Sequence, residues 1–75
     1  MPYIAIKCYP KDPAVKKAVV EKINDVFLEL WGCPPEALSI SMEEISPEKW
    51  EETVVKPEIE PNREKMMILS GQKLY

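Results

Sequence analysis

The second residue of the chain could carry acid–base chemistry. Met1 is followed by Pro2, a small residue of the kind that lets an initiator methionine be removed. Removal would expose a secondary amine, whose pKa lies somewhat above the ~7.7–8.0 of an ordinary α-amino group. A general base that works near pH 7 must be partly unprotonated, so its surroundings have to lower this pKa. Burial beside apolar groups does so because it disfavours the charged form.

No other side chains offer comparable chemistry. The 75 residues include no histidine, which excludes a Ser-His-Asp triad and an imidazole metal site. Glu43 and Glu44 are neighbours on a predicted strand and point to opposite faces, so they cannot form a shared carboxylate pair. Cys8 and Cys33 have no metal-type spacing and are expected to be buried thiols, with a disulfide or a reactive thiol as the alternatives. The sequence implies no metal or organic cofactor.

Charge and hydropathy limit the partners of the chain. Ten basic and 13 acidic residues leave a net charge of −3, which argues against a nucleic-acid partner. No stretch approaches 18 apolar residues, so no membrane span is expected. The start of the chain lacks the basic and apolar regions of a signal peptide, which favours a cytoplasmic location.

Two segments alternate in the manner of strands that each have one apolar face. They are residues 3–8, with Ile4, Ile6 and Cys8 on one side, and residues 38–44, with Leu38, Ile40 and Met42 on one side. The long segment between them is sufficient for a crossover, so the two strands are predicted to be parallel.

A long helix is predicted between the strands. Asp12 can cap its start, Pro13 suits its first turn, and Gly32 ends it after Trp31. Apolar residues recur along it at helical spacing: Val15, Val19, Ile23, Val26 and Leu30. The fold class is therefore α/β (α+β), built on a βαβ unit.

The remaining residues are less regular. Ser46 before Pro47 predicts a short helical turn that carries Trp50, and residues 53–55 are compatible with a brief extended piece. A short C-terminal helix is predicted from Pro57 onward. We expect a single domain over residues 1–75.

Two parallel strands and one main helix are too few to stand alone in water. A chain of this length buries only about 60% of its extended surface, so its own core is marginal. Pairing two protomers would give a four-stranded sheet with both helices on one face. Physical chemistry thus predicts an oligomer without fixing the number of subunits.

Five segments resemble one family when their order and spacing are taken together. They are PYIAIKCYP, the helix end WG, SISMEEI, SPEKW and the tail EIEPNREKM. Over essentially the whole chain they resemble the 4-oxalocrotonate tautomerase family, and within it the short bacterial branch. The resemblance implies an isomerase in which Pro2 is the general acid/base for keto–enol tautomerisation of a small 2-oxo or aromatic enol compound. It also implies a homodimer, since the short branch is dimeric whereas longer-known members are hexameric.

The resemblance places further residues at the site. Trp50 takes the position of the family's pocket aromatic, and Tyr3 could extend this apolar wall. Typical members hold a substrate carboxylate with arginines, but the corresponding neighbourhoods here contain Lys11 and Ser39, and the only arginine is Arg63. A lysine supplies a point charge instead of a bidentate fork, so a substrate less dependent on its carboxylate is expected. Alternatively, Lys11 is a solvated loop residue without a role in binding, and Trp50 is an ordinary core or interface residue.

Two other functions remain open at this point. A non-enzymatic dimeric binding module that keeps the fold and its apolar pocket would account for the missing arginines. A hydratase or dehalogenase of the same superfamily would need more polar and cationic groups to activate water than this chain supplies.

Overall fold

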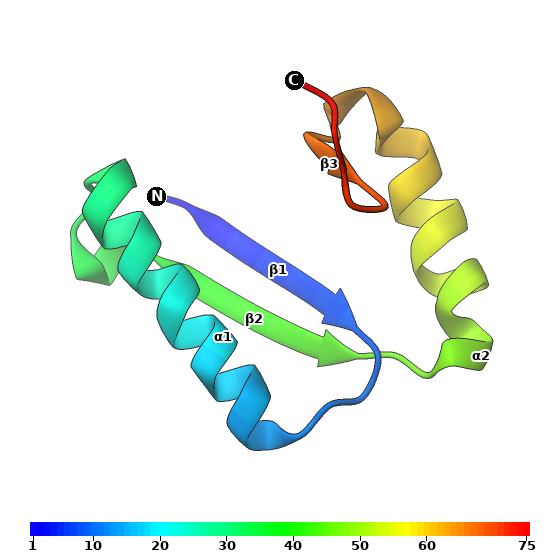
Figure 1. Cartoon of the computed structure of the whole chain (residues 1–75), viewed down its shortest axis with the longest axis horizontal. Coiled ribbons are helices and arrows are strands. Elements are labelled where there is room, and N and C mark those ends of the chain that lie inside the picture. The colour runs from blue at the N-terminus through cyan, green and yellow to red at the C-terminus, as the bar shows by residue number, and fades with distance from the viewer. The chain divides into compact units, whose positions relative to one another are not determined.

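The computed structural model describes all residues from Met1 to Tyr75. It divides into two compact units, Met1–Ile45 and Ser46–Tyr75, which we describe separately (Figure 1). The expectation of one domain over residues 1–75 stays a prediction.

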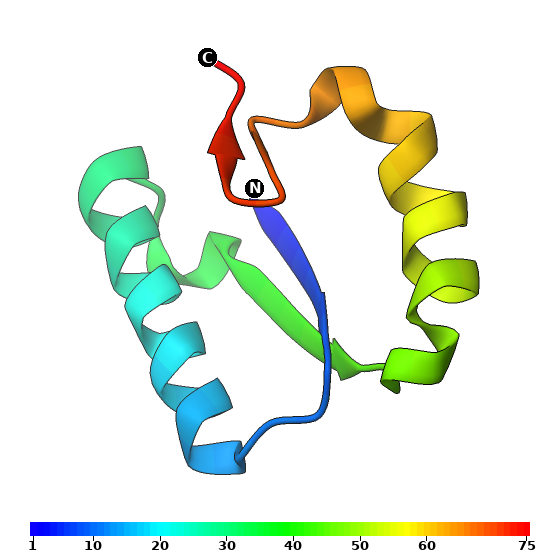
Figure 2. The ribbon, with the colours of Figure 1, turned by 45° about the vertical axis from the view of Figure 1, so that its right-hand side comes forward.

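The first unit is a βαβ unit. Strand β1 (Tyr3–Cys8) pairs in parallel with β2 (Ser39–Glu44), and the register begins with Tyr3 opposite Ser39. Helix α1 (Pro13–Val26) connects the two strands and runs in the opposite direction to both (Figures 1 and 2). This arrangement confirms the predicted parallel strands and the α/β class.

Local signals set both ends of the helix. The Asp12 carboxylate accepts a hydrogen bond of 2.9 Å from the backbone N–H of Ala14, which satisfies one of the donors left free in the first turn. After α1 the chain continues as a π-helical turn, η1 (Phe27–Trp31), and Gly32 ends it with φ of 77°. Only glycine adopts this left-handed conformation without a steric penalty. A short 3₁₀ turn, η2 (Pro35–Ala37), then leads into β2.

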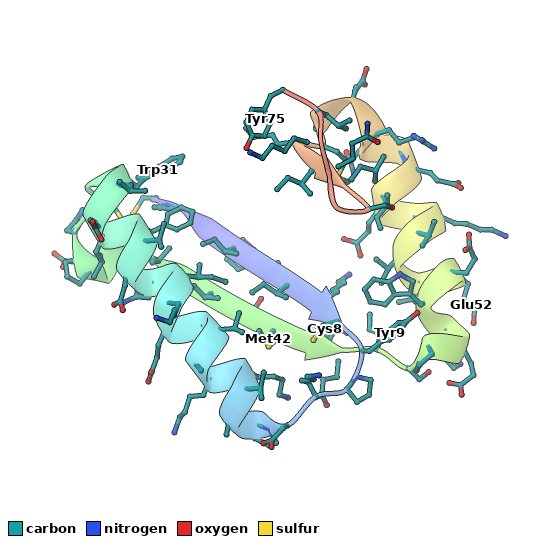
Figure 3. All side chains as sticks on the ribbon, viewed as in Figure 1. Cys8, Tyr9, Trp31, Met42, Glu52 and Tyr75 are labelled. Carbon is teal, nitrogen blue, oxygen red and sulfur yellow. The ribbon has the colours of Figure 1, made fainter.

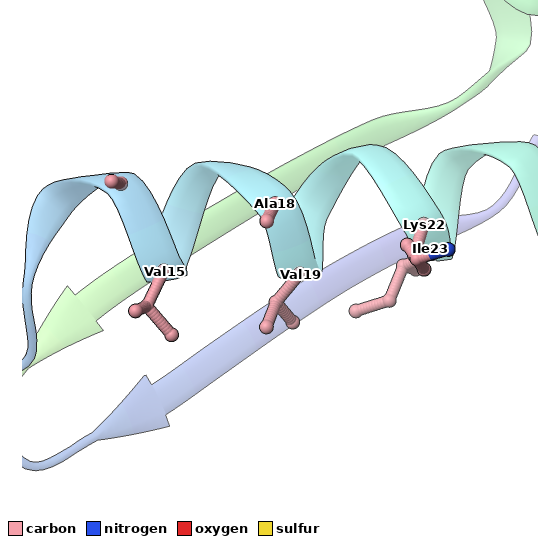
Figure 4. A pocket seen from close by; sticks show the side chains of 6 residues that line it. Val15, Ala18, Val19, Lys22 and Ile23 are labelled. Carbon is pink, nitrogen blue, oxygen red and sulfur yellow. The ribbon is translucent and has the colours of Figure 1, made fainter.

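The apolar surface of α1 is largely uncovered within the first unit. Ile45 is the only buried hydrophobic residue of this unit, with 7% of its surface exposed, and α1 itself contains no buried residue. An apolar groove runs along the helix, with Val15, Val19 and Ile23 in a row beside it (Figure 4). Two strands alone are too narrow to cover this surface. The helix was predicted correctly, but most of its apolar stripe has no partner in the first unit.

The second unit begins with one long helical run. It consists of α2 (Pro47–Trp50), η3 (Glu51–Ile59), which has π-helical spacing, and η4 (Glu60–Lys65), a 3₁₀ segment. The predicted extended piece at residues 53–55 is wrong. The β-branched residues there favour a strand but lower helix propensity only slightly. Continuation of the helix that begins at Pro47 therefore outweighs their preference for a strand.

Proline disturbs this run without ending it. Pro57 lies inside η3, where it removes one N–H, and the wider π-helical spacing coincides with it. Asn62 departs from helical geometry just after Pro61, and its side-chain amide donates to the carbonyl of Glu58 at 2.7 Å.

Val54 is the buried residue of this unit. None of the helices has the length and apolarity that a membrane crossing requires.

The chain ends in a hairpin that the sequence analysis missed. Strands β3 (Ile68–Leu69) and β4 (Gln72–Lys73) pair in antiparallel fashion. The two residues between them, Ser70 and Gly71, both have positive φ, as a tight hairpin turn requires. The available signal was this Ser-Gly pair between two short segments.

Candidate active site

Pro2 lies at the amino-terminal end of the two-stranded sheet. Its carbonyl oxygen accepts a hydrogen bond of 3.3 Å from the backbone N–H of Ser39, and its side chain is half-buried. The parallel register also sets Tyr3 opposite Ser39. The structure thus brings together three of the predicted site residues, from the starts of β1 and β2.

The state of Met1 decides the chemistry of the Pro2 nitrogen. While Met1 is attached, this nitrogen belongs to a tertiary amide and is not basic. Met1 is 98% exposed, so the bond to be cleaved is not protected by packing of this residue. Its removal would convert the amide nitrogen into a secondary amine at the same place.

Tyr3 lies on the face of the sheet opposite to α1. Its hydroxyl is 3.3 Å from the Ser41 Oγ, and either group can donate the hydrogen bond. The tyrosine remains 70% exposed, and Ala5, Ser39 and Ser41 on the same face are also exposed. This face of unit 1 can offer a ring for stacking and hydroxyl groups for hydrogen bonding.

Lys11 lies beyond the opposite end of β1. The six residues of this strand span about 20 Å at ~3.3 Å per residue, so Lys11 and Pro2 of one chain do not meet at a small substrate. The lysine is exposed, and its backbone N–H donates a 3.0 Å hydrogen bond to Glu44 Oε2. Within one protomer, the structure does not bring this predicted substrate contact to the other site residues.

Glu44, which the sequence analysis excluded from a carboxylate pair with Glu43, makes contacts that were not predicted. The same Oε2 atom also accepts a 2.8 Å hydrogen bond and ion pair from Lys16 Nζ. The hydrogen bond from Lys16, followed by that from the backbone of Lys11, lowers the pKa of the Glu44 carboxyl. Alternation along β2 was the available signal, because Glu44 shares the strand face of Ile40 and Met42 and so lies on the helix side.

The remaining predicted residues are Trp50, in the second unit, and the two cysteines, in the first. Trp50 is half-buried at the end of α2 in the second unit, so its place beside Pro2 stays a prediction. Cys8 and Cys33 are free thiols and are half-buried, which is less than the full burial expected. Cys8 is the last residue of β1 and lies beside the end of β2 that contains Met42 (Figure 3). No group of three or more His, Cys, Asp or Glu residues is arranged to hold a metal ion.

Comparison with known proteins identifies the family. No family model matches the chain. The tautomerase PptA of Shigella sonnei (strain Ss046) is 33% identical over 76 aligned positions, which cover 99% of this chain and all of that protein. The tautomerase PptA of Escherichia coli O127:H6 has the same identity and coverage, and that of Escherichia coli strain SMS-3-5 is 34% identical over 80% of this chain and 87% of its own length. These relatives match the chain over most or all of its length, and its βαβ unit is the one that the family resemblance predicts. This chain therefore belongs to the 4-oxalocrotonate tautomerase family.

Proposed function

We propose that this chain is a keto–enol tautomerase in which the amine of Pro2 is the general acid/base. One observation carries the proposal: a half-buried Pro2 is held at the start of β1 by the Ser39 N–H, in a chain whose full-length relatives are named tautomerase. The backbone bond limits where the nitrogen can lie relative to the sheet. A catalytic base benefits from such fixed geometry.

The reaction moves one proton twice. After removal of Met1, the neutral amine of Pro2 accepts the proton of the substrate's enol oxygen and becomes a secondary ammonium. Electrons shift to form the ketone, and the ammonium returns the proton to the carbon at the other end of the enol system. The amine is regenerated, and no redox group or water is consumed. Proton transfer by a positioned group of this kind accelerates reactions typically by about 10²–10⁴-fold.

The side chains favour a small 2-oxo or aromatic enol compound as substrate. The Ser39 hydroxyl or nearby backbone amides would stabilise negative charge that develops on the substrate oxygen. Tyr3 and Trp50 would supply an apolar wall, which also lowers the pKa of the Pro2 amine by desolvation. Lys11 would contact one carboxylate as a single charge. The only arginine of the chain, Arg63, belongs to the second unit.

The working form would be a cytoplasmic homodimer in which residues 1–75 act as one domain. Pro2 and Lys11 of one chain are separated by the length of β1, so a substrate that contacts both needs Lys11 from a second copy. The uncovered apolar stripe of α1 gives that second copy a surface to bind. Two protomers would form the four-stranded sheet that one cannot.

The direct test is ketonisation of enol-phenylpyruvate by protein from which Met1 has been removed. Pro2→Ala is expected to lower kcat by about 10²-fold or more, because a primary amine on a less constrained residue replaces the prolyl base. The exposed Pro61, distant in sequence from the site, provides the matched control, and Pro61→Ala should retain activity. Equal rates for Pro2→Ala and the unsubstituted protein would refute the assigned role.

The absence of any arginine in the first unit favours one second candidate, a non-enzymatic binding module. Such a protein would keep the fold and an apolar pocket without needing a free amine at Pro2. The intact mass of protein purified from its native cells separates the two functions. A retained Met1 blocks the Pro2 nitrogen and supports the binding module, whereas a mass lower by one methionine supports the enzyme.

A further inference from the structure

We propose that Glu44 is a positioning residue for substrate binding: its carboxylate fixes the loop between β1 and α1 so that Lys11 presents its ammonium to the substrate carboxylate. The inference rests on the proposed function, in which Lys11 is the contact for that carboxylate. Glu44 itself would not touch the substrate.

One oxygen atom of Glu44 accepts two hydrogen bonds. Glu44 Oε2 accepts the Lys11 backbone N–H at 3.0 Å and the Lys16 ammonium at 2.8 Å. These donors come from the loop and from the first turns of α1, whereas Glu44 ends β2. One carboxylate therefore joins three segments of the first unit at a single point.

The chain on either side of Lys11 is also held by hydrogen bonds. Before it, the carbonyl of Cys8 accepts a 2.8 Å bond from the N–H of Ile45, which ties the end of β1 to the residue after Glu44. After it, Asp12 caps the helix through the N–H of Ala14. The bond to Glu44 adds a fixed point at Lys11 itself, between these two anchors.

The charges around Glu44 are arranged so that the Lys11 ammonium is not neutralised. An acceptor beside a substrate-binding lysine could cancel the charge that the substrate needs. Here Glu44 pairs with the Lys16 ammonium, and it holds Lys11 only through the backbone. The Lys11 ammonium has no ion pair within the chain. Both partners of the Lys16–Glu44 pair are partly exposed, with 27% and 35% of their side-chain surface accessible, so a large stability contribution is not expected.

The test separates KM from kcat in three variants. Glu44→Ala removes the acceptor and is expected to raise KM for enol-phenylpyruvate about tenfold, with kcat within about twofold, because only binding of the carboxylate is lost. Glu44→Gln keeps an oxygen acceptor for the Lys11 N–H and should restore most of the affinity. Glu43→Ala is the matched control on the other face of the strand and should leave both constants unchanged.

A second substrate and a structural measurement complete the test. The methyl ester of enol-phenylpyruvate has no charge for Lys11 to bind, so Glu44→Ala should leave its KM unchanged. Amide hydrogen exchange at Lys11 should become faster in Glu44→Ala, whereas the Ala14 amide, held by Asp12, should stay protected. Unchanged exchange at Lys11, or an equal rise in KM for the acid and the ester, would overturn the proposal. Failure of the proposed function appears separately, as undiminished activity of Pro2→Ala.

Discussion

At the scale of single residues, the charge of Lys11 should decide how well a carboxylate substrate binds. Lys11→Ala is expected to raise KM for enol-phenylpyruvate about tenfold, since about 1.4 kcal/mol of binding free energy corresponds to that factor. Lys11→Arg should keep or lower KM because a guanidinium can grip a carboxylate with two parallel bonds. Steady-state kinetics measure both. Lys17→Ala, on the exposed surface of α1, is the control. An unchanged KM in Lys11→Ala would assign this residue to the solvated loop.

Tyr3 allows the roles of a ring and a hydroxyl to be separated. Its bond to Ser41 is long and exposed, so Tyr3→Phe should change the free energy of unfolding by less than about 0.5 kcal/mol and leave KM for aromatic enols nearly unaltered. Tyr3→Ala removes the ring from the proposed wall and should raise that KM severalfold. Kinetics with an aromatic and an aliphatic enol check the difference. A similar loss in Tyr3→Phe and Tyr3→Ala would show that the hydroxyl, not the ring, is the contact.

At the scale of elements, α1 depends on the residue that precedes it. Asp12→Ala removes the acceptor for the Ala14 N–H and should lower the free energy of unfolding by about 1 kcal/mol. Asp12→Asn should cost only a few tenths of a kcal/mol, because asparagine caps nearly as well. Urea denaturation at fixed protein concentration gives both values. Glu21→Ala, on the exposed side of α1, is the control, and equal midpoints for all three variants would contradict the capping role.

The bond between the loop and β2 should depend on pH in a defined direction. Lys16 and the Lys11 backbone lower the pKa of Glu44, so the native state favours the ionised carboxylate. Its contribution is fully present above the ordinary carboxyl pKa of about 4.3 and is lost as the pH falls through the lowered native pKa. NMR of the Lys11 amide should therefore show a transition below that ordinary value. The transition should be absent in Glu44→Gln, and a transition above pH 5 would contradict this account.

Local signals explain which elements could be predicted from the sequence. Asp12, Pro13 and Gly32 determine the ends of the long helix through backbone geometry, so those ends were predictable. Residues 53–55 were not, because the choice between helix and strand there follows from the helix already begun at Pro47. The C-terminal hairpin is too short to produce an alternating pattern.

The candidate site was predictable in part, because strands that the sequence shows clearly position some of its residues. Pro2, Tyr3 and Ser39 come together because parallel pairing of two recognisable strands sets their register. The bonds of Glu44 were not predicted because its partners, Lys11 and Lys16, lie about 30 residues away, and only the fold joins them. The separation of Pro2 from Lys11 likewise follows from the direction of β1, which a resemblance between sequences does not reveal.

At the scale of the whole molecule, each of the two units buries little apolar surface, so we expect association with a second copy to stabilise the chain. Ile45 and Val54 are its only buried hydrophobic residues, whereas many large apolar side chains are exposed, among them Val15, Val19, Val26, Leu30 and Trp31. If the protein is the dimer proposed above, light scattering should give twice the chain mass of 8.7 kDa. The midpoint of thermal unfolding should rise with protein concentration, because association stabilises only the folded chains. A mass of one chain and a concentration-independent midpoint would contradict the dimer. A mass of six chains would indicate a hexamer instead.

Mixing two defective dimers tests whether each site is shared between copies. If Pro2 of one chain works with Lys11 of the other, a dimer of one Pro2→Ala chain and one Lys11→Ala chain has one intact site and one site with both defects. Random exchange makes half of the dimers mixed, so a twofold-symmetric assembly predicts about one quarter of the unsubstituted kcat/KM. Without exchange of subunits, the two parent variants should give only the mean of their two low kcat/KM values. If both residues of a site came from one chain, mixing would restore nothing, and the distance along β1 would have to be bridged in some other way.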